Sequence, residues 1–210
     1  MIAALTNRSC RRLALTGTFA SLLFLPAARG EDLPGAALVR LLQQGGYVIV
    51  MRHARSPDTP PTADKADPEN PGHQRQLDET GEETARAMGA AFKALHIPVG
   101  EVWSSPTYRA LQTVQLADLP RPQTATEIGD GTTTPADGAA WLQAKVTQPP
   151  QPGTDTVIIT HYPNITAALG KAADAPSDGE AIVFHPGETE PAAVVGRIKI
   201  EDWPKLAERR

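Results

Sequence analysis

The side chains of this chain that are best suited to chemistry stand where short apolar segments end. Arg52, His53 and Arg55 follow one such segment, and His161 follows a second. Imidazole changes between a neutral nucleophile and a cation near neutral pH, and guanidinium groups bind and neutralise phosphate oxygens. A histidine held between two arginines is therefore suited to attack a phosphoryl group whose charge the arginines neutralise.

The elements that must position these side chains alternate between strand-like and helix-like segments. Continuous apolar strands separated by helices predict an α/β three-layer sandwich with a mainly parallel sheet flanked by helices. Ligands of such sheets bind beyond the carboxyl ends of the strands, and helix N-termini at that edge attract phosphate. The expected strands end at Met51, Trp103 and Thr160, and two more, over 180–186 and 192–200, close the chain as a pair.

Capping signals predict where two of the helices begin. Thr80, followed by Glu83, has the spacing of a capping box and predicts the start of a helix over 78–98. Ser105 before Pro106 predicts the start of the next helix, with proline in its first turn. Further helices are expected over 35–46 and 134–146, and a long polar loop over 58–77.

Composition limits the class of protein. A chain of 210 residues that is 40% hydrophobic is long enough to bury one sizeable core. Its net charge of -4 provides no general basic field for nucleic acid, so we expect no nucleic-acid partner. Cys10 is the only cysteine and lies in the N-terminal segment, so thiolate zinc sites and cysteine nucleophiles are excluded from the rest. No metal constellation is visible, and we expect neither a metal nor a cofactor.

Residues 1–30 have the pattern of a secretory signal peptide. Three arginines precede the apolar run 13–25, and small residues follow at Ala28 and Gly30. The run is shorter than the ~20 residues that span a bilayer. We therefore expect a signal peptide over 1–30, a domain over 31–210, a periplasmic or secreted location and no stable membrane insertion after cleavage. A retained N-terminal anchor is the alternative.

Three blocks between residues 47 and 200 resemble the histidine phosphatase (phosphoglycerate mutase-like) superfamily. "RHARS", from Arg52, is similar to its Arg-His-Gly-x-Thr/Ser signature, "SSPTYRALQT", from Ser104, to its second block, and "ITHYPNI", from Ile159, to its third. All three lie at the ends of expected strands and occur in the family's order. The resemblance implies a phosphoglycerate mutase-like fold. It also implies a cofactor-independent phosphatase that hydrolyses a small-molecule phosphomonoester through a phosphohistidine intermediate.

The resemblance also implies roles for individual residues. His53 would be the nucleophile, and Arg52, Arg109 and His161 would bind the phosphoryl oxygens and stabilise developing charge. Arg55 and Ser56 lie close enough in sequence to assist the binding of phosphate.

The leaving oxygen needs a proton, and the resemblance offers a donor. Family members take this proton from a glutamate before isoleucine, a context that Glu127 matches. Asp130 is the alternative donor.

The chain departs from the family signature at Ala54, where glycine is usual. Alanine fits there without strain only if φ is negative. A secreted subgroup with alanine at this position also has a block similar to residues 73–85, and it includes enzymes proposed to act on phosphorylated sugars of the lipopolysaccharide core. We therefore expect a small phosphorylated molecule as the substrate, with a sugar phosphate as one candidate. His73, Gln74 and Arg75 lie in or beside the long polar loop, where they either shape the substrate pocket or form part of a solvated loop.

Three other functions fit the same fold. A catalytically silent phosphate-binding or sugar-phosphate-binding protein would not require a nucleophilic histidine, so His53 argues against it. A phosphohistidine-protein phosphatase or a mutase normally needs cytoplasmic substrates, and the signal peptide argues against both.

Overall fold

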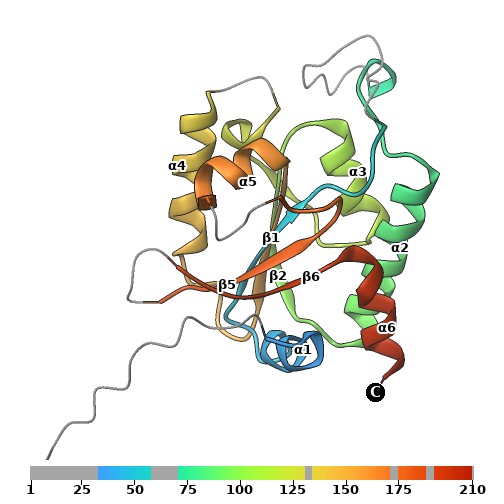
Figure 1. Cartoon of the computed structure of the whole chain (residues 1–210), viewed down its shortest axis with the longest axis vertical. Coiled ribbons are helices and arrows are strands. Elements are labelled where there is room, and N and C mark those ends of the chain that lie inside the picture. The colour runs from blue at the N-terminus through green and yellow to red at the C-terminus, as the bar shows by residue number, and fades with distance from the viewer. Residues whose placement is uncertain (1–32, 58–70, 131–133, 171–174, 188–191, 210) are drawn as a thin grey trace, which may run out of the picture.

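The strands of the computed structural model form one twisted sheet (Figure 1). The structure describes residues 33–57, 71–130, 134–170, 175–187 and 192–209. In this part of the chain the strands are β1 (Val48–Arg52), β2 (Val99–Ser104), β3 (Gln123–Thr124), β4 (Asp155–Thr160), β5 (Ala181–His185) and β6 (Ala193–Ile198). The expected signal peptide and most of the expected polar loop lie outside the described residues.

The sheet is mostly parallel. Its strand order is β3-β2-β4-β1-β5-β6, in which β3, β2, β4 and β1 run parallel, and β5 and β6 are antiparallel to their neighbours. The predicted α/β sandwich and the predicted C-terminal strand pair are confirmed. Because β2, β4 and β1 are parallel neighbours, their carboxyl ends meet at one edge.

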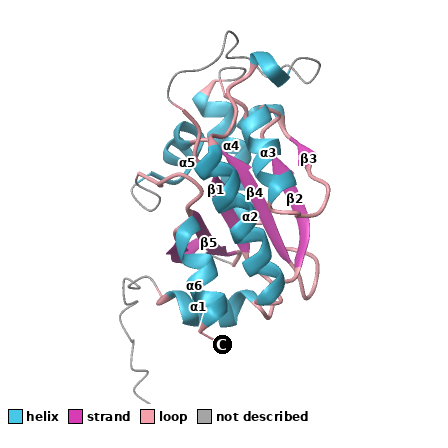
Figure 2. Ribbon diagram, turned by 90° about the vertical axis from the view of Figure 1, so that its right-hand side faces the viewer, coloured by secondary structure: helices cyan, strands magenta, loops and turns pink. Residues whose placement is uncertain are grey.

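Helices cover both faces of the sheet (Figures 1 and 2). One face packs against α1, α2, α3 and α6, and the other against α4 and α5. Successive β1 residues alternate between the two cores, as a pleated strand requires: Ile49 and Met51 enter the first, Val48 and Val50 the second. The helices are α1 (Gly35–Leu42), α2 (Glu79–Ala94), α3 (Tyr108–Leu116), α4 (Pro135–Val146), α5 (Tyr162–Leu169) and α6 (Trp203–Glu208), with short 3-10 turns at Pro71–His73, Thr126–Ile128 and Ile200–Asp202.

The start of α2 differs from the predicted capping box. Asp78, not Thr80, is the N-cap, and its carboxylate accepts a hydrogen bond from the Gly81 amide at 2.8 Å. Gly81 also lets the chain after His53 approach closely, because a Cβ there would lie 2.0 Å from the carbonyl oxygen of Arg55. The N-terminus of α2 is therefore docked onto the loop that follows β1.

The start of α3 is also later than predicted. The helix begins at Tyr108 after the N-cap Thr107, and not at Ser105-Pro106. The hydroxyl of Ser105 accepts from the amide of Thr107, one residue before the helix, at 3.2 Å, and it also lies 2.8 Å from Nε2 of His161. The Tyr108 amide instead donates to Oε1 of Gln74 at 2.7 Å, so a distant side chain caps α3.

In the described part of the chain no helix is long and apolar enough to cross a membrane.

Candidate functional site

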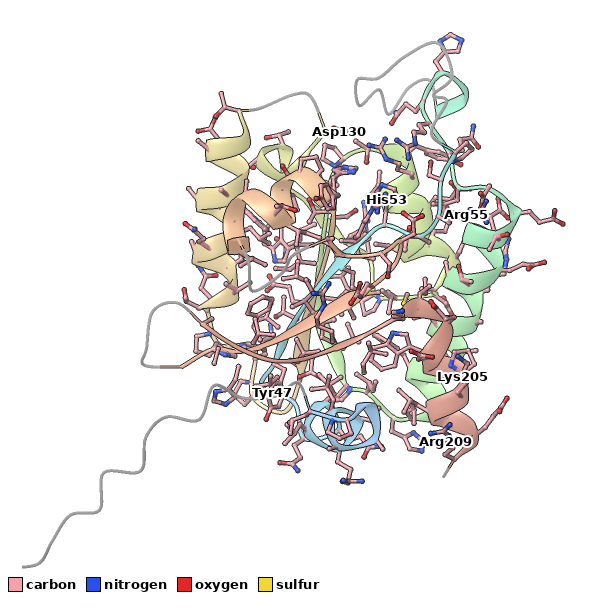
Figure 3. The ribbon with its side chains drawn as sticks, viewed as in Figure 1. Tyr47, His53, Arg55, Asp130, Lys205 and Arg209 are labelled. Carbon is pink, nitrogen blue, oxygen red and sulfur yellow. The ribbon has the colours of Figure 1, made fainter. Side chains whose placement is uncertain are left out.

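Three strand ends bring the candidate residues together. The amide of His53, after β1, donates to the carbonyl of Thr160 on β4 at 3.0 Å, and the Ser105 amide, after β2, donates to Ile159 on β4 at 2.9 Å. The ring centroids of His53 and His161 are 5.2 Å apart, and both side chains are buried. Figure 3 shows His53 and Asp130 at this end of the sheet and Tyr47 at the opposite end.

The contacts of His53 define its protonation state. Nδ1 lies 2.7 Å from the carbonyl oxygen of Ala54, which only accepts, so Nδ1 carries the hydrogen. Nε2 accepts from Nε of Arg109 at 3.1 Å. Burial, with the charges of Arg109, Arg52 and Arg75, lowers the pKa of His53 to about 3, although the bond to Ala54 opposes the shift. His53 is thus a neutral imidazole whose Nε2 lone pair faces Arg109.

Alanine at position 54 fits the backbone without strain. Ala54 is buried, and it is not among the described residues with positive φ. Its amide donates to Oγ1 of Thr113 at 3.1 Å, and this hydroxyl donates to the carbonyl of Arg109 at 2.8 Å. The departure from glycine therefore leaves the loop joined to the helix that carries Arg109.

His161 has the opposite tautomer. Nδ1 lies 3.2 Å from Nη2 of Arg109, which only donates, so Nδ1 is an acceptor and the hydrogen is on Nε2. Nε2 contacts Oγ of Ser105 at 2.8 Å and Oγ1 of Thr107 at 3.1 Å. Burial, and then the charge of Arg109, hold the pKa of His161 well below its ordinary value. His161 is also neutral here.

Arg109 contacts both histidines and is itself buried. It is the second residue of α3, whose start Gln74 caps. Its Nη2 also forms an ion pair with Asp130. Its guanidinium thus lies where a phosphoryl group would reach both rings. A bound phosphoryl group would accept hydrogen bonds from the same Arg109 N–H groups that now donate to the ring nitrogens.

The two candidate proton donors have different surroundings. Asp130 pairs with Arg109, and its loop is held by Asn164, which donates to the carbonyls of Ile128 at 2.8 Å and Gly129 at 3.1 Å. The Glu127 carboxylate accepts from Oγ1 of Thr126 at 3.4 Å. Asp130 is therefore in direct contact with the site. In its ion pair it acts as an acceptor, so proton donation would require the pair to open.

The other predicted phosphate-binding residues have partners of their own. Arg52 pairs with Asp178 at 2.8 Å and donates to the Pro176 carbonyl at 3.2 Å, while its charge still lowers the pKa of both histidines. Arg55 is 59% exposed and pairs with Asp78 at 3.0 Å, on the side that faces α2 (Figure 3). The binding of phosphate by Arg52 and Arg55 remains a prediction.

Ser56 holds a neighbour of the site. Its hydroxyl donates to the carbonyl of Gln76 at 2.6 Å and accepts from Nε of Arg75 at 2.9 Å. The sequence predicted that Ser56 assists phosphate binding. To do so, its hydroxyl would have to give up a hydrogen bond to Gln76 or Arg75.

Sequence reasoning missed the contacts that hold the reactive groups in place. Ser105 and Thr107 fix His161, Gln74 caps α3, and Asn164 holds the loop that carries Asp130. Their types gave only a weak signal, since a serine before a proline equally predicts a helix cap. His73, named as a pocket residue, is exposed in the 3-10 turn Pro71–His73.

A hollow on the α4 and α5 side of the sheet is a separate feature. About 680 Å³ lies between α4, α5 and β5, lined by residues such as Gln143, Leu169 and Phe184, away from the histidines. Among the described residues no group of three or more His, Cys, Asp or Glu side chains could hold a metal ion.

Comparison with known proteins supports the family resemblance. A family model described as "Histidine phosphatase superfamily (branch 1)" matches residues 48–129, which include β1, His53 and Arg109. The match supports a phosphatase. No curated protein matches the chain.

Solved structures show the same fold. A structure of the protein histidine phosphatase SixA complexed with tungstate has a TM-score of 0.56 at 18% identity, covering 74% of this chain and 98% of its own. A putative phosphohistidine phosphatase SixA from Agrobacterium tumefaciens gives 0.52 at 15% identity, with 73% and 97% covered. A mutant phosphoserine phosphatase from Entamoeba histolytica in complex with phosphoserine gives 0.51 at 11% identity, with 74% and 98% covered. The phosphoglycerate mutase-like architecture is thus confirmed.

Proposed function

We propose that the protein is a phosphomonoesterase of the histidine phosphatase superfamily that forms a phosphohistidine at His53. The observation that carries this proposal is the state of His53, which is buried and neutral, with its Nε2 lone pair directed at the guanidinium of Arg109. A group that only bound phosphate would serve better as a cation. The direct test is the release of inorganic phosphate from a panel of phosphomonoesters by the purified protein.

The reaction follows from these contacts in two steps. When a phosphoryl group binds, the N–H groups of Arg109 donate to its oxygens and no longer to the two rings. The lone pair on Nε2 of His53 is then free to attack phosphorus. The P–N bond forms as the ester P–O bond breaks, and the leaving oxygen keeps the electron pair and takes a proton from a carboxylic acid. Water then attacks phosphorus, gives its proton back to the carboxylate, and releases phosphate and free His53.

Replacement of Glu127 or Asp130 should distinguish the two proton donors. A sugar alkoxide departs poorly without a proton, whereas nitrophenolate departs readily as an anion. If Glu127 donates the proton, Glu127→Gln should lose about 10²-fold in kcat on a sugar phosphate and much less on nitrophenyl phosphate. Both substrates would be measured with Glu127→Gln and Asp130→Asn side by side.

The contrast between the substrates decides the assignment. Equal losses of Glu127→Gln on both substrates would mean that the side chain supports structure or binding. A leaving-group dependence confined to Asp130→Asn would make Asp130 the donor and show that its pair with Arg109 opens during turnover.

The proposed location and substrate are supported by the sequence. The signal-like pattern of residues 1–30 supports export, and the secreted subgroup that the sequence resembles supports a phosphorylated sugar as substrate. We expect the mature protein to begin near Glu31 and to be released with periplasmic contents, as read by N-terminal sequencing of the fractionated protein. An intact Met1 on cytoplasmic protein would contradict export.

A second candidate function is dephosphorylation of phosphohistidine in a protein. One structure with the same fold is described as a protein histidine phosphatase and another as a putative phosphohistidine phosphatase, which favours this activity. The two functions are separated by kcat/KM for a phosphohistidine protein against kcat/KM for small sugar phosphates. A higher value for the phosphoprotein would make this candidate the main activity.

A further inference from the structure

The arginines around His53 differ in what neutralises them. Three form ion pairs with carboxylates: Arg52 with Asp178, Arg55 with Asp78, and Arg109 with Asp130. Within the described ranges Arg75 donates instead to neutral oxygens of Ser56, from Nε to Oγ at 2.9 Å and from Nη2 to the carbonyl at 3.3 Å. No described carboxylate therefore forms an ion pair with Arg75.

The chain around Arg75 is fastened to the helix that carries Arg109. Gln74 accepts from the first amide of α3 at 2.7 Å, and the Leu77 amide donates to Oε1 of Gln112, also on α3, at 2.9 Å. Between these two points the Gln76 carbonyl accepts from Ser56 at 2.6 Å. Arg75 is thus held at a defined place relative to Arg109 and the loop after β1.

Arg75 acts on the reactive centre from a greater distance than Arg109. Its charge is one of the causes that lower the pKa of His53 and of His161. The hydrogen bonds of its guanidinium nevertheless go to Ser56, while Arg109 contacts both rings. A phosphoryl group bound by Arg109 between the histidines would therefore leave Arg75 facing the rest of the substrate.

Resting on the proposed phosphatase function, we propose that Arg75 binds a second anionic group of the substrate, a carboxylate or a second phosphate. The preferred substrates are then phosphomonoesters that carry another acidic group. A guanidinium binds carboxylate and phosphate oxygens through the same fork of N–H donors. Arg75 is half-buried and forms no ion pair with a carboxylate in the described ranges, so its charge gains from such a ligand.

Matched pairs of esters test this specificity. O-phosphoserine and phosphoethanolamine differ by a carboxylate, and a hexose bisphosphate and a hexose monophosphate differ by a phosphate. In the full-length protein, Arg75→Gln should lower kcat/KM about 10- to 100-fold for the acidic member of at least one pair, the value expected for a charge-assisted hydrogen bond. It should leave the other member and inhibition by inorganic phosphate nearly unchanged. The pair that responds identifies the acidic group.

Controls separate this inference from the proposed function. Arg86→Gln removes an exposed arginine of α2 that pairs with Glu82. It should leave kcat/KM unchanged for both members of each pair. Equal losses within both pairs, or no loss in either, would overturn the role of Arg75 while the phosphatase stands. If the wild type released phosphate from none of the esters, the proposed function would fail. The role of Arg75 would then be tested by calorimetric measurement of the binding of the same pairs. If Arg75→Gln kept the wild-type preference for the acidic member, that role would be contradicted.

Discussion

His53→Ala is expected to abolish phosphatase turnover, leaving no phosphate release above the uncatalysed rate. The side chain supplies the nucleophile of the first step, and alanine cannot form the P–N bond. The measurement is phosphate release from nitrophenyl phosphate and from a sugar phosphate, with folding checked by thermal melting. Retained turnover in His53→Ala would contradict covalent catalysis by this residue, because even a good leaving group needs the nucleophile.

The pH dependence of kcat/KM provides a second test of the state of His53. Because its pKa is lowered to about 3, the free protein keeps His53 neutral well below the ordinary imidazole value of 6.5. Protonation of the nucleophile should therefore reduce kcat/KM only as the pH approaches 3, and not as it falls through 6.5. An NMR titration that places the pKa of His53 near 6.5 would show that the buried, neutral state described here does not hold in solution.

Arg109→Ala is expected to lose on the order of 10³-fold in kcat/KM. The loss arises because Arg109 is placed to bind the phosphoryl oxygens and to stabilise charge as the ester bond breaks. Arg109 also holds down the pKa of His161, second to burial. The pKa of His161 should accordingly rise in Arg109→Ala, while remaining below its ordinary value because burial persists.

The matched variant is Arg109→Lys, which keeps the charge and removes the fork that reaches both rings. It should recover part of the lost activity without restoring it fully. A loss in Arg109→Ala of less than about 10-fold would place Arg109 outside the group that stabilises the transition state.

The sequence was sufficient to predict the edge of the sheet at which the site lies. Apolar, β-branched runs determined β1 and β4, and parallel pairing then brought His53 and His161 to the same end of the sheet. These predictions succeeded because they rest on burial and on strand direction, which a single sequence encodes locally.

The contacts of the polar side chains could not be predicted in the same way. Arg55 is two residues from His53 in sequence, yet it pairs with Asp78, whereas Arg75 is 22 residues away and influences both rings. The prediction of the α2 cap was wrong for a related reason, since Asp78 and Thr80 are both of residue types that cap helices. Tertiary contacts decided between them, as Asp78 also pairs with Arg55.

Phosphate is expected to be transferred to Nε2 of His53, and this transfer can be detected by trapping the phosphohistidine intermediate. Wild-type protein would be mixed with labelled phosphomonoester, quenched within milliseconds in base, and digested for mass spectrometry. Phosphohistidine survives base and hydrolyses in acid, so base-stable, acid-labile label is expected on the peptide that contains His53, and none on His53→Ala. Turnover of the ester with no label on that peptide, or with label on a different residue, would contradict this transfer.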